Sequence, residues 1–198
     1  MSESENTTGL CVEGCEECPD LVASRSRIVN GVGPADADVV FVGEGPGANE
    51  DEQGEPFVGR SGDVLNAALA DHGLSRGDVR ITNCVRCRPP ENRDPTDAEL
   101  ANCRPYLDAE LEAVAPDVVV ALGKVPAQHL LGRDVAVTKE AGTIETVAVG
   151  DARLDVLICV HPAATLYDRS QEDTFESAIE KVATIVGAEG GQSSLGDF

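Results

Sequence analysis

The sequence predicts a three-layer α/β protein, in which helices cover both faces of a central, mostly parallel sheet of four strands. Two observations support this. Four short runs rich in β-branched residues recur along the 198-residue chain, and their nearly continuous apolar character is typical of strands buried on both faces. Segments with a helical pattern lie between the runs, and such alternation favours a parallel sheet. The expected strands cover residues 38–42, 79–83, 117–122 and 153–160.

The expected helices carry start and stop signals. The segment 61–73 begins with a Ser and ends at a Gly, and the segment 96–115 opens on a capping box formed by Thr96 and Glu99. Pro105 is expected to kink or divide this second helix, because proline lacks the backbone N–H that a helix needs. Two further helices are expected over residues 124–132 and 174–187.

The chain is expected to form one domain over residues 11–187. The polar segments 1–10 and 188–198 are expected to be disordered tails. No apolar run approaches the roughly 20 residues that a membrane-spanning helix needs. The acidic N-terminus lacks the basic and apolar regions of a signal peptide. We therefore expect a monomeric, cytoplasmic protein without a membrane partner.

The chain is strongly acidic, with a formal net charge of −21 at pH 7. One interpretation is a protein that avoids polyanions. The other is adaptation to a salt-rich cytoplasm, as in a halophile, where an acidic surface keeps proteins soluble. We favour the halophilic interpretation because the acidic residues are spread along the whole chain. At ~1 M salt the Debye length is only ~3 Å, so the net charge does not exclude DNA as a partner.

Seven cysteines are many for a cytoplasmic protein, and an odd number without a secretory signal argues against a disulfide framework. Cys15 and Cys18 form a C-x2-C pair before the first strand, and Cys87 and Cys103 flank a later loop. One close pair and two single thiols suit a tetrahedral metal ion or a four-iron cluster, and the spacing does not separate zinc from iron–sulfur. Cys84 and Cys159 are expected to be ordinary buried residues, and Cys11 a bystander or an alternative ligand.

The turn after the first strand has the spacing G-x-G-x-x-A, from Gly43 to Ala48, which is the fingerprint of a dinucleotide-binding turn. Asp63 follows about twenty residues later, where a ribose-binding acid would lie. A redox enzyme would need a helix that starts at this turn and leads to a second strand before Asp63. Instead Pro46 is followed by an acidic run that would repel a pyrophosphate, and Asp63 is expected to begin a helix. We therefore expect no nicotinamide cofactor.

The whole set of motifs resembles family 4 uracil-DNA glycosylases, the iron–sulfur enzymes of bacteria and archaea. The motifs are GEGPGANEDEQGEPFVGRSG (43–62), TNCVRCRPPENRDPT (82–96), ALGKVPAQHLLG (121–132) and HPAA (161–164). The resemblance implies a uracil-DNA glycosylase-like fold with a four-stranded parallel sheet. It also implies a [4Fe-4S] cluster held by Cys15, Cys18, Cys87 and Cys103. The implied reaction is hydrolysis of the N-glycosidic bond of deoxyuridine in single- and double-stranded DNA, which leaves an abasic site for base excision repair.

The resemblance further implies which residues bind the flipped base. Phe57 would stack on uracil in a tight pocket. Asn83 ends the second strand, and its amide offers a donor and an acceptor that match uracil O4 and N3–H but not cytosine. His161 follows the last strand and would donate a hydrogen bond to uracil O2, where negative charge develops as the bond breaks. His72 and His129 are expected to be structural.

Two acidic residues are candidates for handling the attacking water. Glu44 lies where related families place a polar residue near this water, and a carboxylate there could also stabilise an oxocarbenium-like sugar. Glu50, in the run NEDE, is the other candidate, although a solvated acidic surface is the plain alternative for residues 50–52. The backbone N–H of Gly45 could bond to the uracil edge or to a phosphate. Asn92 could support the site.

DNA affinity must come from local positive charge, and the sequence places it around the cysteine loop at Arg86, Arg88, Arg93 and Arg104. The cluster would then brace this loop rather than transfer electrons.

Three questions stay open at this stage. The stretch after HPAA departs from the family order, so a DNA wedge at Leu166 or Tyr167 is a guess. Contact with a sliding clamp is undetermined. A non-catalytic or covalently trapping uracil-DNA binder is the alternative function, but trapping relatives use a histidine in a basic insertion, and residues 87–99 contain no histidine.

Overall fold

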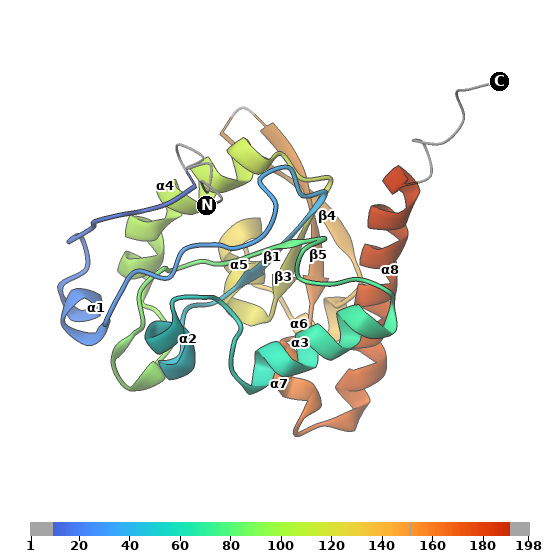
Figure 1. Ribbon diagram of the computed structural model, residues 1–198, viewed down its shortest axis with the longest axis horizontal. Coiled ribbons are helices and arrows are strands. Elements are labelled where there is room, and N and C mark those ends of the chain that lie inside the picture. The colour runs from blue at the N-terminus through green and yellow to red at the C-terminus, as the bar shows by residue number, and fades with distance from the viewer. Residues whose placement is uncertain (1–9, 151, 191–198) are drawn as a thin grey trace, which may run out of the picture.

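The computed structural model describes residues 10–150 and 152–190. Its centre is a sheet of five strands in the order β2-β1-β3-β5-β4 (Figure 1). Strands β1, β2, β3 and β5 run parallel, and β4 pairs antiparallel with β5. The strands are β1 (Val39–Gly43), β2 (Arg80–Asn83), β3 (Val118–Leu122), β4 (Ile144–Val149) and β5 (Ala152–Cys159).

Helices cover both faces of the sheet, which confirms the three-layer α/β prediction. Successive strand residues point to opposite faces. In β1, Phe41 therefore packs in a core with residues of α3 and α8, whereas Val40 and Val42 pack in a second core with residues of α4 and α5. The long helices are α3 (Arg60–Asp71), α4 (Asp97–Val114), α5 (Lys124–Leu131) and α8 (Glu172–Gly190). The short elements are α1 (Pro19–Ser24), α2 (Ala48–Gln53), η1 (Pro90–Asn92), α6 (Val137–Glu140), α7 (Pro162–Thr165) and η2 (Arg169–Gln171).

The fifth strand, β4, corrects the prediction of a four-stranded sheet. All four predicted strands are present, but β4 adds an antiparallel edge to β5. Only Val149 of this strand is buried, and Ile144 is 48% exposed. An edge strand with one solvated face has no continuous apolar run, so the signal that found the buried strands was absent here.

The start of α4 confirms the predicted capping box. The Thr96 hydroxyl accepts from the Glu99 amide at 3.2 Å, and the Glu99 carboxylate accepts from the Thr96 amide at 2.8 Å. Of the two outcomes expected at Pro105, a kink or a division, the division is wrong, because α4 continues through the proline to Val114. Its C-terminal half packs Leu107 and Leu111 against the sheet, and such tertiary packing stabilises a helix despite one missing N–H.

A buried ion-pair network joins β2 to α4. The carboxylate of Glu110, which is fully buried, accepts from Arg80 Nε at 2.6 Å and from an Arg86 guanidinium nitrogen at 2.7 Å. The Thr82 hydroxyl donates to the same carboxylate at 2.8 Å. The Arg86 guanidinium also donates to Asn30 Oδ1 at 2.9 Å. Since every charge here is paired and hydrogen-bonded, the network can stay in the interior.

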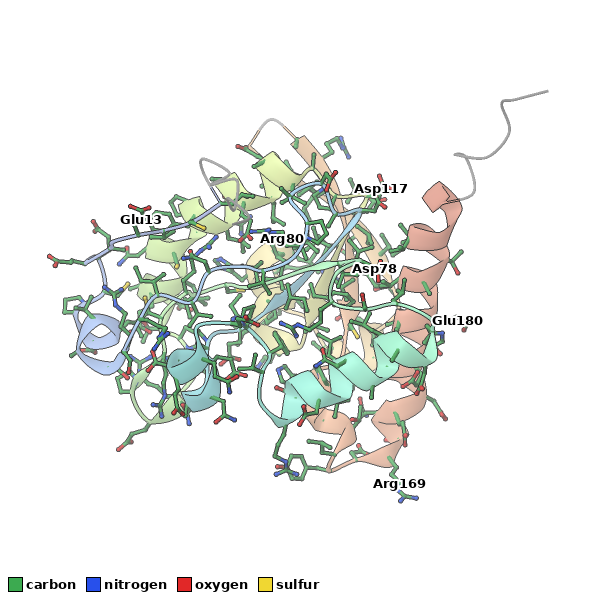
Figure 2. All side chains as sticks on the ribbon, in the orientation of Figure 1. Glu13, Asp78, Arg80, Asp117, Arg169 and Glu180 are labelled. Carbon is green, nitrogen blue, oxygen red and sulfur yellow. The ribbon has the colours of Figure 1, made fainter. Side chains whose placement is uncertain are left out.

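The remaining sequence expectations concern the chain ends and the surface. Residues 1–9 and 191–198 of the expected tails lie outside the described residues, while Leu10 is buried and α8 extends to Gly190. None of the helices in the described ranges is long and apolar enough to cross a membrane. Acidic side chains point outward at widely separated places on the molecule, as Figure 2 shows for Glu13, Asp78, Asp117 and Glu180.

Candidate active site

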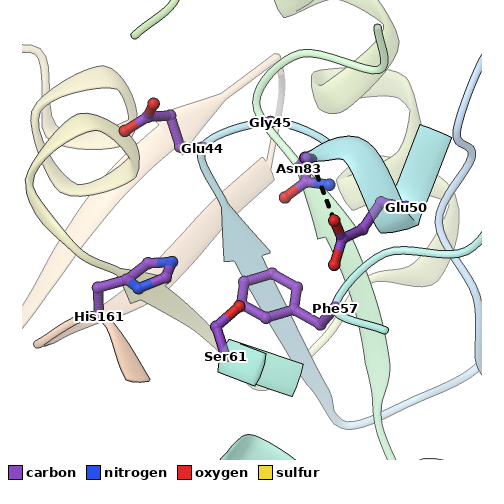
Figure 3. Close-up of a pocket in the computed structure, with 8 residues that line it drawn as sticks. Glu44, Gly45, Glu50, Phe57, Ser61, Asn83 and His161 are labelled. Atoms are coloured by element: carbon purple, nitrogen blue, oxygen red, sulfur yellow. Dashed lines mark hydrogen bonds between the residues drawn. The ribbon is translucent and has the colours of Figure 1, made fainter. Parts of the chain in front are cut away.

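A cavity of about 340 Å³ lies at the carboxyl ends of the parallel strands, and its size suits a small heterocycle. Figure 3 shows the side chains around it. The lining residues come from separate segments of the chain: Glu44, Gly45, Gly47, Glu50, Phe57, Ser61, Asn83 and His161. The structure therefore brings together all the residues proposed from the sequence for base binding and for catalysis.

The backbone of the turn after β1 packs closely against the cavity walls. Gly43 lies opposite Asn83 in the register of β1 and β2, and its carbonyl accepts from the Cys84 amide at 2.8 Å. A methyl group on Gly43 would overlap both the Phe57 ring and the Asn83 amide. The first glycine of the G-x-G-x-x-A spacing thus makes room for an aromatic ring and an amide.

A short helix does begin at this turn, which corrects the sequence expectation. Helix α2 starts at Ala48, after an N-cap at Gly47, and ends at Gly54. No strand occurs in the described segment between α2 and α3, and Asp63 lies in the first turn of α3. The crossover from β1 to its parallel neighbour β2 runs through α2 and α3, and Asp63 lies within α3 rather than after a second strand, where the ribose-binding acid of a dinucleotide-binding unit would lie.

Glu50 is held by three backbone N–H groups. Its Oε2 accepts from Gly47 at 3.1 Å, the dashed line in Figure 3, and its Oε1 accepts from Val58 and Gly59 at 3.0 and 2.9 Å. Only 9% of the residue is exposed, so the interpretation as a solvated acidic surface is wrong for Glu50. A carboxylate has about four lone-pair sites, so one site is left for a water molecule or a sugar.

The neighbouring acids differ from one another. Asp51 is 3% exposed, and its carboxylate oxygens accept from the Ser26 amide at 2.8 and 3.0 Å. The solvated-surface interpretation is therefore wrong for Asp51 too, whose role is to anchor the segment after α1 on α2. Glu52 is exposed and fits that interpretation.

Phe57 and His161 lie on neighbouring walls of the cavity, with ring centroids 5.9 Å apart and ring planes inclined by 31°. His161 caps α7, because its Nδ1 accepts from the Ala163 amide at 3.1 Å. A ring nitrogen that accepts carries no proton, so the proton of the neutral imidazole lies on Nε2. Burial lowers the pKa of His161, which keeps the ring neutral near neutral pH. His161 therefore offers a neutral Nε2–H donor.

Asn83 ends β2 and is 3% exposed. Within the described part of the chain no hydrogen bond engages its side-chain amide. A buried amide normally has partners, and its donor and acceptor here border the cavity. Both groups are therefore available to a ligand.

Glu44 borders the cavity, but its carboxylate points away from Phe57 and Asn83 in Figure 3. Burial raises the pKa of Glu44 to about 7, and the neighbouring Asp94 carboxylate adds to the rise. The group is thus close to half protonated at neutral pH. A base with a pKa near the working pH is well suited to take a proton from water.

Gly47 and Ser61 also line the cavity and were missed in the sequence analysis. Ser61 was expected only as the cap of a helix, whereas α3 begins one residue earlier, at Arg60. Ser61 lines the cavity together with Phe57. A polar residue in the first turn of a helix that follows a binding loop is the signal that could have found it.

Asn92 lies outside this cavity, in a neighbouring pocket of about 340 Å³ that is also lined by Glu50. Its Oδ1 accepts from Arg88 Nε at 2.8 Å. Leu166 and Tyr167 line the same pocket and are 41% and 81% exposed. The pocket thus extends the site outward to an exposed apolar pair.

The four cysteines proposed as ligands come from three segments of the chain. Cys18 is the N-cap of α1, Cys15 precedes it, Cys87 follows β2 and Cys103 lies in α4. Burial raises the pKa of Cys103 to about 11, and the nearby Cys87 and Cys15 thiols add to the rise while Arg86 opposes it. The Cys15 and Cys18 thiols in turn raise the pKa of Cys87, so each of the four thiols lies close enough to influence at least one of the others.

Two N–H groups donate to sulfur in this region. Arg25 donates to Cys87 Sγ at 2.9 Å and to the Cys15 carbonyl at 2.6 Å, and Asn102 donates to Cys18 Sγ at 3.5 Å. Four thiols with N–H···S donors match in kind the donor set of an iron–sulfur cluster. Over the described ranges, no three or more His, Cys, Asp or Glu side chains are placed to hold a single metal ion.

Most of the arginines expected to contact DNA form ion pairs with acidic residues of the protein itself. The expectation is wrong for Arg86, which is 2% exposed and belongs to the buried network with Glu110. Two others have acidic partners: Arg93 pairs with Glu99 at 2.7 Å and Arg104 with Asp108 at 2.6 Å. Among the described residues, the one hydrogen-bond partner of the Arg88 side chain is Asn92. The Arg86–Glu110 pair joins separate segments and carries no sequence signal. Arg104 and Asp108, by contrast, are four residues apart in one helix, a spacing that could have indicated their pairing.

The fold and the site define a class of protein: an α/β protein with a small heterocycle pocket at its strand ends, built from an aromatic ring, an open amide and a fixed imidazole donor. A family model described as "Uracil DNA glycosylase superfamily" matches residues 30–183. The chain therefore belongs to the uracil-DNA glycosylase superfamily.

The relatives point to one branch of this superfamily. The chain is 39% identical over 191 residues to a type-4 uracil-DNA glycosylase of Archaeoglobus fulgidus, with 94% of each chain covered. It is 41% identical over 182 residues to that of Thermotoga maritima, covering 90% of this chain and 93% of the relative. It is 36% identical over 179 residues to that of Sulfurisphaera tokodaii, covering 88% and 81%. These similarities confirm the family that the motifs indicated.

Proposed function

We propose that this protein excises uracil from DNA by hydrolysing the N-glycosidic bond of a flipped deoxyuridine, leaving an abasic site for base excision repair. The observation that carries the proposal is the open amide of buried Asn83, which shares a base-sized cavity with Phe57 and a neutral His161 donor. The type-4 uracil-DNA glycosylases among its relatives support the same activity.

Recognition of the base follows from the cavity walls. Asn83 can donate to uracil O4 and accept from N3–H, and cytosine presents the reverse pattern at these positions. The Phe57 ring gives the flipped base a surface on which to stack. Gly45 also lines the cavity, and its backbone N–H would supply a further donor for the base edge or a phosphate. A site with these fixed polar groups can reject the wrong base strongly, because a mismatched base leaves buried groups unpaired.

Cleavage of the N-glycosidic bond places negative charge on the departing base, and His161 would stabilise that charge. Its Nε2–H would donate to uracil O2, and the bond strengthens as the oxygen becomes anionic. The hydrogen bond from Ala163 to Nδ1 holds the ring in this tautomer before the substrate arrives. Such preorganisation lowers the barrier because no group has to reorient during the reaction.

The two cavity acids would divide the remaining work. Glu44, with a pKa of about 7, would take the proton from the attacking water. Glu50, fixed by three N–H groups, would place its carboxylate charge near the sugar and stabilise the oxocarbenium-like transition state. Asn92, in the adjoining pocket with Glu50, would support the bound sugar or water.

Cys15, Cys18, Cys87 and Cys103 would hold a [4Fe-4S] cluster. When bound, the cluster would supply a structural link among the segment before α1, the loop after β2 and α4. The N–H groups of Arg25 and Asn102 that donate to sulfur support this assignment, because such donors stabilise cluster thiolates. No step of the base-excision reaction passes through this link.

The substrate would be both single- and double-stranded DNA, and the protein would act as a monomer in the cytoplasm, without a nicotinamide cofactor or a membrane partner. The spread of exposed acids supports a halophilic origin, with salt screening the repulsion between them. Stability should therefore rise with KCl concentration, which thermal unfolding from low to about 2 M salt would measure.

A direct test uses the purified, iron-loaded protein in high salt on oligonucleotides that carry a single deoxyuridine, as single strands and as duplexes. We expect alkali-labile abasic sites with no strand break before alkali. Matched oligonucleotides with cytosine or thymine at the same position should stay intact. Intact deoxyuridine substrates would overturn the proposal, and a protein–DNA species that survives a denaturing gel would favour a trapping function instead.

A further inference from the structure

We propose that Arg76 is a positioning residue that, together with Glu50, holds Phe57 in the backbone conformation that presents its ring to the base. The proposal rests on the proposed function and deepens it. Arg76 does not line the cavity; it lies between α3 and β2, 19 residues from Phe57 in the sequence. Its role would therefore be exerted through Phe57.

Phe57 adopts an unusual backbone conformation. Its φ angle is +54°, in the left-handed region that residues with a Cβ atom avoid and that bulky side chains rarely occupy. The loop would relax to a more common conformation unless the surrounding structure held it. Contacts from neighbouring side chains must therefore hold Phe57 in place.

Arg76 holds the carbonyl groups on one side of this loop. Its two terminal nitrogens donate to the Pro56 carbonyl at 2.7 Å and to the Phe57 carbonyl at 3.1 Å. A third bond, to Asn66 Oδ1 at 3.3 Å, ties the same guanidinium to α3. The planar guanidinium can bind two successive carbonyls at once, which the ammonium group of lysine cannot reproduce with the same geometry.

Glu50 holds the amide groups that follow. Its Oε1 accepts from the backbone N–H groups of Val58 and Gly59. Arg76 thus binds two consecutive carbonyl groups and Glu50 binds the next two amide groups, so two charged side chains from separate parts of the chain hold the loop. The peptide groups on both sides of the Phe57 Cα are thereby fixed. This is the arrangement that a strained, functional loop conformation requires.

The fixed backbone leaves the Phe57 ring little freedom. The residue is 5% exposed, and its ring lies against Gly43, where a methyl group would overlap it. The Phe57 carbonyl lies against Gly62 of α3, where a side chain would also collide. With the ring centroid 5.9 Å from that of His161, a small rotation of the loop would change the space left for the base. Stacking therefore depends on the contacts of Arg76.

The test is a double-mutant cycle for uracil release. We expect Arg76→Ala to lower kcat/KM by about tenfold, mainly through a higher KM, because a misplaced ring weakens base stacking. Arg76→Lys should recover only part of the loss. In a Phe57→Ala background, Arg76→Ala should cost nothing more, since contacting residues that act as a unit are not additive. Arg133→Ala, which removes an equal charge paired with Glu140 and Glu145, is the matched control and should retain full activity.

A second measurement reports the environment of the Phe57 ring independently of enzymatic activity. The chain has four Phe, so ¹⁹F NMR of protein labelled with fluorophenylalanine can follow Phe57, assigned from a Phe57→Leu variant. Arg76→Ala should shift or broaden that resonance, and Arg133→Ala should not. Equal losses from Arg76→Ala with and without Phe57, or an unchanged Phe57 resonance, would overturn the proposal. A shifted resonance in a protein that releases no uracil would instead refute the proposed function and leave the positioning role standing.

Discussion

The cavity at the strand ends and the region of the four cysteines are built in opposite ways. In the cavity, backbone N–H groups fix two of the side chains before a ligand binds: Glu50 has three N–H donors and His161 Nδ1 has one. In the cysteine region, burial raises the pKa of Cys87 and of Cys103, so these two thiols resist ionisation there.

The cavity is therefore preorganised by the protein alone, whereas the cysteine region needs the proposed bound metal cluster to be complete. The cavity can bind a base as it stands, because Asn83 and the Nε2–H of His161 already border it. Thiolates gathered in a half-buried region repel one another unless a cationic centre binds them. The variants below test these two halves separately.

The largest effect should come from the cysteine region. Cys87→Ala should lose the iron and more than about 4 kcal/mol of stability, because metal binding and folding are coupled. Cys84→Ala is the matched control, since Cys84 is buried three residues away and is not among the proposed ligands. It should keep the iron and stay within about 1 kcal/mol of the parent. Iron analysis and thermal unfolding of both variants would decide, and equal iron content in the two would contradict the assignment.

The next effect should be confined to the cavity. His161→Ala removes the donor to uracil O2 and should lower kcat by roughly 10²–10³, as for other oxyanion donors. The unfolding temperature should change little by comparison. His72→Ala is the control, because His72 contacts Glu176 at 3.2 Å, outside the cavity. Single-turnover uracil release measures the step, and a His161→Ala variant with full activity would remove His161 from the mechanism.

A change in specificity should follow from the open amide. Asn83→Asp should relax discrimination and let cytosine be attacked, because a protonated carboxyl group can donate to N3 of cytosine while its other oxygen accepts from the amino group. We expect the uracil-over-cytosine ratio to fall by on the order of 10². Competition between the two oligonucleotides measures this ratio. An unchanged ratio would show that another residue reads the base.

The smallest effect should appear in the pH dependence. If Glu44 takes the proton from water, activity should rise through pH 7 in the parent and lose this rise in Glu44→Gln. Stability gives an independent check of the sign. Because the pKa of Glu44 is raised from 4.5 to about 7 on folding, its contribution to stability falls as the pH rises between these values. Glu44→Gln should therefore gain stability relative to the parent above pH 7 but not below pH 4.5, as measured by thermal unfolding.

The sequence was most informative where one local pattern decides the structure. Buried strands produce continuous apolar runs, and the capping box of Thr96 and Glu99 is written in four consecutive residues, so both were predicted correctly. The cavity residues followed from motifs at the ends of those strands. Parallel strands that end at one edge necessarily bring such motifs together.

The sequence was least informative where distant segments meet. The pairing of Arg86 with Glu110 and the contact of Arg76 with Phe57 join residues that no periodicity connects. Charged residues have several competing partners in an unfolded chain, and only the packed fold selects one. For the same reason the run of acids left a solvated surface open as the alternative for Glu50, although the residue is 9% exposed and its carboxylate accepts from three N–H groups.

The structure of the protein bound to uracil tests the central claim most directly. We expect the uracil ring stacked on Phe57, its O4 and N3–H paired with the Asn83 amide, and its O2 within hydrogen-bond distance of His161 Nε2. A base bound elsewhere, or one in the cavity with its O4 and N3–H turned away from Asn83, would contradict it.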